Sequence, residues 1–172
     1  RNLHACAKQV MAEYDGVFPS DPALLAQLPG IGRSTAAAIA AFSSGTRAAI
    51  LDGNVKRVFA RTFGVDQFPG LKPVEDALWQ RADALLPVEG IESYTQGLMD
   101  LGASICSRTR PGCERCPVQS LCLAQRAGTV DRFPVKTRKL LRRHESWWLL
   151  IWRSASPDGP KVWLERRPAR GI

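Results

Sequence analysis

Apolar residues recur at helical spacing along most of the first hundred residues. Between residues 2 and 14 they occupy five positions on one side of a helix, namely Leu3, Ala7, Val10, Met11 and Tyr14. A helix with one apolar side buries that side against a core, so the pattern predicts an amphipathic helix. Further helices are predicted over residues 33–44, 55–63, 73–86 and 91–105. The first hundred residues are therefore expected to be all-helical.

Turn-forming residues separate these helices. Asp21 followed by Pro22 is typical of a helix N-cap and first helical residue, which predicts a short helix through Leu28. The Pro-Gly-Ile-Gly string at 29–32 then predicts a tight turn into the helix 33–44. Together these segments predict a helix-hairpin-helix at about residues 21–44.

The pattern changes after residue 143. Residues 145–153 and 161–165 are aromatic and aliphatic, and a Pro-Asp-Gly-Pro string at 157–160 separates them, which predicts a β-hairpin. We divide the chain into a partial helical domain at 1–105, a cysteine loop at 106–123, a basic linker at 124–143 and the start of a truncated β-containing domain at 144–172.

Charge is distributed unevenly. The net charge is +8, but residues 1–105 hold 9 Lys or Arg against 11 Asp or Glu, whereas residues 106–172 hold 15 against 5. Such asymmetry favours a polyanionic partner, with a solvated basic surface as the alternative. No apolar run approaches the roughly 20 residues of a membrane span, so no membrane partner is expected. Both ends look like cuts in a longer chain.

The glycine turn has the chemistry to bind phosphate. Glycines let a ligand approach backbone N–H groups closely, and the N-terminus of the next helix attracts anions. An ordinary helical hairpin, with glycine needed only for tightness, is the alternative. We predict DNA contacts from Pro29, Gly30, Ile31, Gly32 and Arg33.

Four of the five cysteines form one compact motif. Cys106, Cys113, Cys116 and Cys122 are separated by six, two and five residues. Four thiolates this close can ligate one iron–sulfur cluster. A structural zinc site is the main alternative, and disulfides fit less well, because the crowded spacing is wrong for a disulfide-stapled secreted domain. Arg108 and Arg110, in the loop between the first two cysteines, are predicted to contact DNA phosphates.

Asp52 stands just before a predicted helix, in the string Ile-Leu-Asp-Gly-Asn-Val-Lys-Arg-Val at residues 50–58. Taken alone, an aspartate in this place is most often a helix cap.

The hairpin, the string around Asp52 and the cysteine spacing occur in this order in the endonuclease III-like superfamily of DNA glycosylases, which the chain resembles over roughly residues 1–125. Residues 28–36, 50–58 and 99–106 are very similar to the adenine DNA glycosylase (MutY-type) branch. The resemblance implies a mainly α fold, in which a helix-hairpin-helix glycosylase domain with an iron–sulfur cluster loop precedes the first strands of a MutT-like (Nudix-type) α/β domain. The implied cofactor is a [4Fe–4S] cluster.

The resemblance also implies a function in base-excision DNA repair. The family hydrolyses the N-glycosidic bond of adenine mispaired with 8-oxoguanine or guanine in double-stranded DNA. Asp52 is then implied to stabilise the cationic sugar, with Asn54 as its positioning partner and Ser34 as a hydroxyl near the sugar. Lys56, in the same string, is expected to bind DNA. We expect a monomer in the bacterial cytoplasm, acting at the nucleoid.

One residue difference supports the adenine glycosylase branch, and one expected residue is missing. Lyase-active relatives carry a lysine at the position of Ser34, so an enzyme of that bifunctional kind, acting on oxidised pyrimidines, is disfavoured. The family's general acid is a glutamate far upstream of the hairpin, and no glutamate here stands in that motif. The chain alone is therefore expected to be inactive. A non-enzymatic DNA-binding module is the other alternative.

Overall fold

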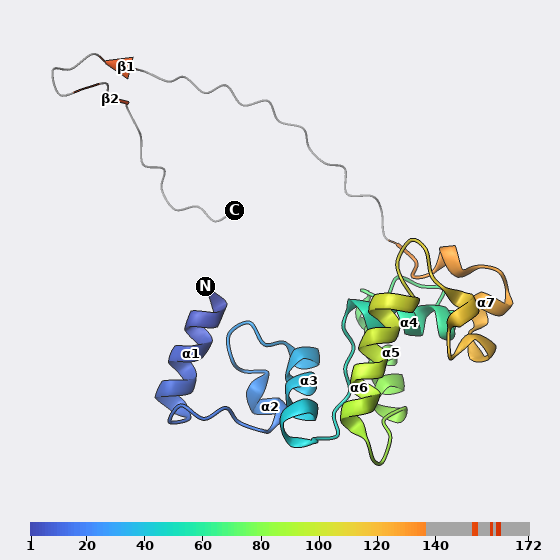
Figure 1. Cartoon of the computed structure of the whole chain (residues 1–172), viewed down its shortest axis with the longest axis horizontal. Helices are drawn as coiled ribbons and strands as arrows, with labels where there is room; N and C mark the ends of the chain where they lie inside the picture. The colour runs from blue at the N-terminus through green and yellow to red at the C-terminus, as the bar shows by residue number, and fades with distance from the viewer. Residues whose placement is uncertain (137–152, 155–158, 160, 163–172) are drawn as a thin grey trace. The chain divides into compact units, whose positions relative to one another are not determined.

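The computed structural model describes residues 1–136, 153–154, 159 and 161–162. The chain divides into two units, Arg1–Arg138 and Lys139–Ile172. The elements of the first unit are the helices α1 (Asn2–Glu13), α2 (Pro22–Leu25), α3 (Arg33–Ser44), α4 (Gly53–Thr62), α5 (Lys72–Ala84), α6 (Ile91–Asp100) and α7 (Leu123–Arg126), a π-helical turn Leu101–Ile105, and 3-10 turns Cys113–Arg115, Gln119–Leu121 and Val130–Arg132. The predicted all-helical character of this part is confirmed (Figure 1).

Local signals explain several helix ends. The Asp21 carboxylate accepts a hydrogen bond from Ala23 N at 2.7 Å and so caps α2, as predicted, although α2 ends at Leu25 rather than Leu28. Gly45 ends α3 in the left-handed conformation, with φ +63°, which glycine adopts without steric cost. The helix predicted over 91–105 is α-helical only to Asp100, after which the backbone widens into the π-helical turn.

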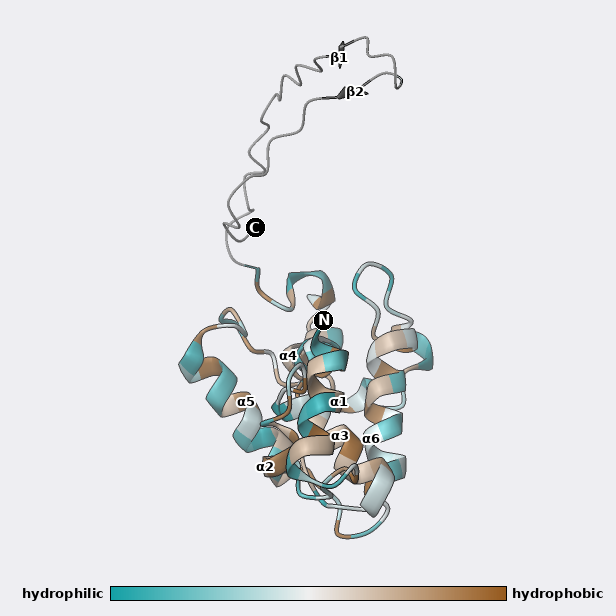
Figure 2. Ribbon diagram, turned by 90° about the vertical axis from the view of Figure 1, so that its left-hand side faces the viewer, coloured by the Kyte–Doolittle hydropathy of each residue, from teal (hydrophilic) through white to brown (hydrophobic). Residues whose placement is uncertain are grey.

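Two hydrophobic clusters stabilise the first unit. The hairpin core joins α1, α2 and one side of α3 through Cys6, Val10, Leu25, Leu28, Ala36 and Ala40. The main core joins the other side of α3, the segment 49–51, α4 and α5, and it includes Ala37, Ile50, Leu51, Val55, Phe59 and Leu78. Figure 2 shows hydrophobic and hydrophilic residues mixed along the same helices, as expected of amphipathic elements. Helix α3 therefore stands between both cores.

The second unit contains one described strand pair. Strands β1 (Arg153–Ser154) and β2 (Lys161–Val162) are antiparallel, with Arg153 opposite Val162. This pair lies within the predicted hairpin, whose remaining residues, like most of the predicted MutT-like segment, fall outside the described part of the chain. In the described part, no helix is long and apolar enough to cross a bilayer.

Candidate active site and four-cysteine centre

The hairpin turn between α2 and α3 depends on glycine. Gly30 has φ +85°, and a Cβ atom there would lie 2.8 Å from Asn2 Cβ on α1. A Cβ atom at Gly32 would meet nothing within 4 Å, so the space beside this glycine is open. Within the described residues, the N–H groups of Gly30 and Gly32 donate no hydrogen bond. The turn thus presents free donors at a helix N-terminus, a suitable place for an anion.

Beside this turn lies a small cavity that contains two of the predicted catalytic residues. Its volume is about 130 Å³, and its lining comprises Ser34, Thr35 and Ala38 of α3, Ile50 and Asp52 before α4, and Met99 of α6. The Ser34 hydroxyl accepts a hydrogen bond from Leu51 N at 2.9 Å. Since Leu51 directly precedes Asp52, this bond fixes the aspartate segment to the first turn of α3.

Asp52 is half-buried and caps α4. Its Oδ1 atom accepts a hydrogen bond from Val55 N at 2.8 Å, the geometry of an N-cap. Its Oδ2 atom accepts no hydrogen bond from the described residues. The cap interpretation is therefore confirmed, and one carboxylate oxygen is left for other contacts beside the cavity.

Asn54 points to a different neighbour. Its Oδ1 atom accepts a hydrogen bond from Arg57 Nη2 at 2.9 Å, and it does not line the Asp52 cavity. Arg57 is buried, and it also donates to the carbonyl oxygens of Gly102 at 2.6 Å and Cys106 at 2.8 Å. Burial lowers the pKa of the Arg57 guanidinium. Asn54 thus belongs to the contact between α4 and the π-helical turn.

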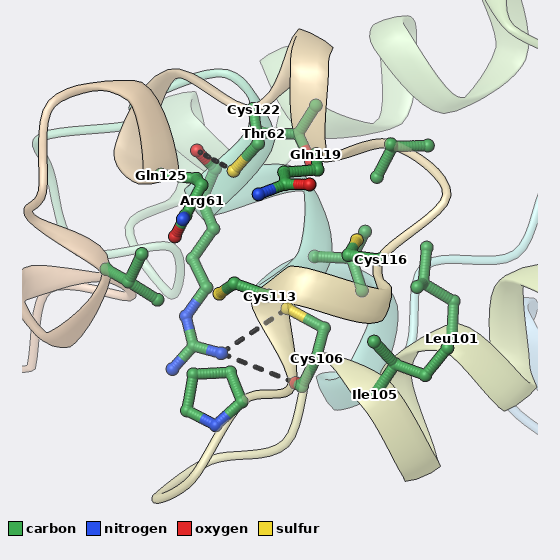
Figure 3. Close-up of a pocket in the computed structure, with 14 residues that line it drawn as sticks. Arg61, Thr62, Leu101, Ile105, Cys106, Cys113, Cys116, Gln119, Cys122 and Gln125 are labelled. Carbon is green, nitrogen blue, oxygen red and sulfur yellow. Dashed lines mark hydrogen bonds between the residues drawn. The ribbon is translucent and has the colours of Figure 1, made fainter.

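The four cysteines of the motif all line one cavity, as Figure 3 shows. Apolar side chains complete most of its wall, including Val58, Leu101, Ile105, Val118 and Val130. Burial raises the pKa of the Cys113 thiol, and the nearby thiols of Cys106, Cys116 and Cys122 raise it further, whereas Arg61 lowers it. Among the described residues, no three Cys, His, Asp or Glu side chains are placed to hold a single metal ion. The thiols surround a common space without meeting at one point.

The sequence does not single out Arg61, yet its side chain donates hydrogen bonds to Cys106, Ser107 and Arg108 of the cysteine segment. It is 2% exposed, and it donates to the sulfur of Cys106 at 3.3 Å and to Ser107 O at 2.7 Å. Arg61 lies three residues after the buried Val58, on the same side of α4, but an arginine is rarely fully buried, so its residue type argues against a core position. Its burial depends on a loop almost fifty residues later in the chain.

The predicted DNA-contact residues differ in their surroundings. The Arg33 guanidinium lies 3.7 Å from the centre of the Trp79 ring and pairs with Asp83 at 3.4 Å. Lys56 Nζ pairs with Glu75 at 2.6 Å. Arg108 and Arg110 are exposed, and their side chains make no hydrogen bond within the described part of the chain. Of these four, only the loop arginines present an unengaged positive charge.

Known proteins resemble this chain in sequence. A family model described as "Helix-hairpin-helix motif" matches residues 13–42. The adenine DNA glycosylase of Buchnera aphidicola subsp. Acyrthosiphon pisum is 38% identical over 152 residues, covering 88% of this chain and 43% of that protein. The human adenine DNA glycosylase is 39% identical, covering 73% of this chain and 23% of its own length. A thymine/uracil-DNA glycosylase of Methanothermobacter thermautotrophicus is 36% identical, covering 70% of this chain and 54% of that protein.

Solved structures give the same relationship. A thermostable thymine-DNA glycosylase matches with a TM-score of 0.65 and 34% identity, covering 73% of this chain and 58% of that one. An endonuclease III in a non-covalent DNA complex matches with a TM-score of 0.58 and 25% identity, covering 74% and 58%. The chain spans about half the length, or less, of the relatives that it matches.

Proposed function

Because this chain belongs to the endonuclease III-like helix-hairpin-helix DNA glycosylases, we propose that it is the part of an adenine DNA glycosylase that holds the sugar and the phosphate backbone. The observation that carries this proposal is the cavity shared by Asp52 and Ser34 at the N-terminus of α3. A phosphate bound at the hairpin would bring a flipped nucleotide beside the carboxylate.

The chemistry is hydrolysis of an N-glycosidic bond. As the bond to the base breaks, the sugar acquires positive charge, which a fixed carboxylate stabilises. Asp52 fits this task because its cap to Val55 N and the Ser34–Leu51 bond fix its position, while Oδ2 accepts no hydrogen bond from the described residues. Ser34 has no amine, so a Schiff base with the sugar does not form there.

The departing adenine also needs a proton. No second carboxylate lines the Asp52 cavity within the described residues. We assign that step to an acid from the upstream part of the enzyme, as the family resemblance implies. The action on adenine opposite 8-oxoguanine or guanine, within double-stranded DNA in a bacterial cytoplasm, belongs to this proposal too.

The four cysteines fit an iron–sulfur cluster. They line one largely apolar cavity. Four thiolates can hold either a zinc ion or an iron–sulfur cluster, and the family resemblance favours the cluster. We propose that Cys106, Cys113, Cys116 and Cys122 hold a [4Fe–4S] cluster, which when bound would fix the fold of their loop.

A second candidate activity is removal of thymine or uracil. The similarity to the Methanothermobacter enzyme and to the thermostable thymine-DNA glycosylase structure favours it. A single-turnover assay separates the two, with the chain joined to the upstream half of an adenine DNA glycosylase and given duplexes with A:8-oxoguanine, A:G, T:G and U:G. Release of adenine alone supports the proposal, and release of thymine or uracil from T:G and U:G contradicts it.

A further inference from the structure

Hydrogen-bond acceptors from two segments far along the chain from α4, residues 106–108 and Phe133, surround the Arg61 guanidinium. Besides Cys106 Sγ and Ser107 O, it donates to Cys106 O at 3.4 Å, Arg108 O at 3.3 Å and Phe133 O at 3.1 Å. In return, the Cys122 thiol donates to the Arg61 carbonyl oxygen at 3.4 Å. One residue of α4 therefore contacts the first and the last cysteine of the motif, as Figure 3 shows.

The charge on Arg61 has no carboxylate partner. In the described part of the chain, the ion pairs join Arg33 to Asp83, Lys56 to Glu75 and Lys72 to Asp76, and none includes Arg61. A buried cation without a counter-charge is costly. Four thiolates around an iron–sulfur core carry excess negative charge, and they lie in the cavity that Arg61 lines.

We propose that Arg61 is the positioning residue and internal counter-cation of the four-cysteine centre. This inference rests on the proposed cluster. Its guanidinium fixes Cys106 and the backbone of the arginine loop, residues 107–112, and its N–H bond to the Cys106 sulfur draws electron density from that ligand. Hydrogen bonds and positive charge at a ligand sulfur stabilise the reduced cluster, so Arg61 raises the reduction potential.

The geometry also links the cluster to DNA binding. Arg61 holds the carbonyl oxygens of Ser107 and Arg108, while the Ser107 hydroxyl donates to Arg110 O at 2.6 Å. The two exposed loop arginines therefore stand on a backbone that Arg61 anchors. A loop ordered in advance loses less entropy when it binds phosphates.

The test compares Arg61→Gln and Arg61→Lys in the full chain. Arg47→Gln is the matched control, because Arg47 also donates to backbone carbonyls, those of Leu86 and Pro87, but away from the cysteines. We measure iron per chain, the rate of iron loss to a chelator, the cluster's midpoint potential and amide hydrogen exchange in residues 106–112.

Arg61→Gln is expected to lower the potential, to speed iron loss by about 10–100-fold and to speed exchange in the arginine loop. Arg61→Lys keeps the positive charge but loses the planar fork of N–H donors. We therefore expect it to keep most of the cluster's midpoint potential, while amide hydrogen exchange in the arginine loop becomes faster. Arg47→Gln should match the unmodified chain in all four measurements.

Unchanged potential and exchange in Arg61→Gln would overturn the inference, as would equal effects in Arg47→Gln. If Arg61→Gln does not fold, Arg61→Lys tests the inference instead. Loop exchange and iron loss in Arg61→Lys equal to those of the unmodified chain would contradict the positioning role. An unmodified chain without iron would contradict the cluster itself, and loop exchange in the variants would still test Arg61.

Discussion

Asp52 combines an observed structural role and a proposed chemical role in one carboxylate. One of its oxygens caps α4. The other accepts no hydrogen bond from the described residues, and Asp52 lines the cavity. Asparagine caps helices about as well as aspartate, so the two roles can be separated by substitution.

We predict that Asp52→Asn, in the chain joined to the upstream half of an adenine DNA glycosylase, lowers the rate of adenine release by at least about 100-fold. Mispair binding and the unfolding midpoint should hardly change, because the amide keeps the cap and removes only the charge. Single-turnover kinetics and gel-shift binding measure both. Asp21→Asn, a cap on α2 outside the cavity, is the control, and a similarly small effect for both variants would leave Asp52 as a cap only.

How far residue roles can be predicted from sequence depends on where their partners lie. Asp21 and Asp52 were identified as caps because their partners are two and three residues away. Arg33 and Lys56 were predicted to bind DNA, but their partners Asp83 and Glu75 lie 50 and 19 residues later, beyond any local pattern. DNA contact by Arg33 and Lys56 stays a prediction.

At the scale of elements, the contact between α4 and the π-helical turn depends on Gly102. A Cβ atom there would lie 2.8 Å from Asn54 Cβ and 3.2 Å from its backbone carbon. The sequence of residues 91–105 predicts a continuous helix and contains no signal for the π-helical turn. The turn lies where α4 closely approaches this segment.

Gly102→Ala should therefore destabilise the chain by about 1–3 kcal/mol, because backbone has to move to admit the methyl group. Gly97→Ala in α6 is the matched control, since a Cβ at Gly97 meets nothing within 4 Å and alanine favours the helix. Denaturant unfolding measures both. Equal stability of the two variants would show that the contact is looser than described.

The cysteine loop is the second element whose fold depends on distant contacts. Cys113→Ser should abolish iron binding and weaken DNA binding, because the 3-10 turns between the cysteines bury no residue that would hold the loop without the metal. Elemental analysis and DNA titration test this. Cys6→Ser, in the hairpin core, is the control for general loss of stability and should leave the iron content intact. Zinc in place of iron in the unmodified protein would contradict the cluster.

At the scale of the whole molecule, DNA binding is expected to be mainly electrostatic. The net charge of +8, the hairpin N–H groups and the loop arginines all favour phosphate.

The chain alone is predicted to bind duplex DNA with strong salt dependence, with little preference for a mispair, and to release no adenine. Arg108→Ala and Arg110→Ala should each reduce the salt slope by about 1, uniformly across sequences. Lys72→Ala, on α5, is the control, since Lys72 already pairs with Asp76. Titration at several salt concentrations measures the slopes, and adenine release by the purified chain would show that a residue within it supplies the proton.

Helix α3 has a further consequence for the Asp52 cavity. The residues that α3 buries most fully are all alanine, namely Ala36, Ala37, Ala40 and Ala41, so its packing between the two cores relies mainly on side chains without rotamers. These alanines cannot adjust their packing by changing rotamers, so the position of α3 between the two cores follows its backbone. At the Asp52 cavity, α3 contributes only the short side chains of Ser34, Thr35 and Ala38, and Leu51 N holds the Ser34 hydroxyl. Under the proposed function, most of the adaptation to a different nucleotide would therefore fall to Met99 of α6, the most flexible side chain of the lining.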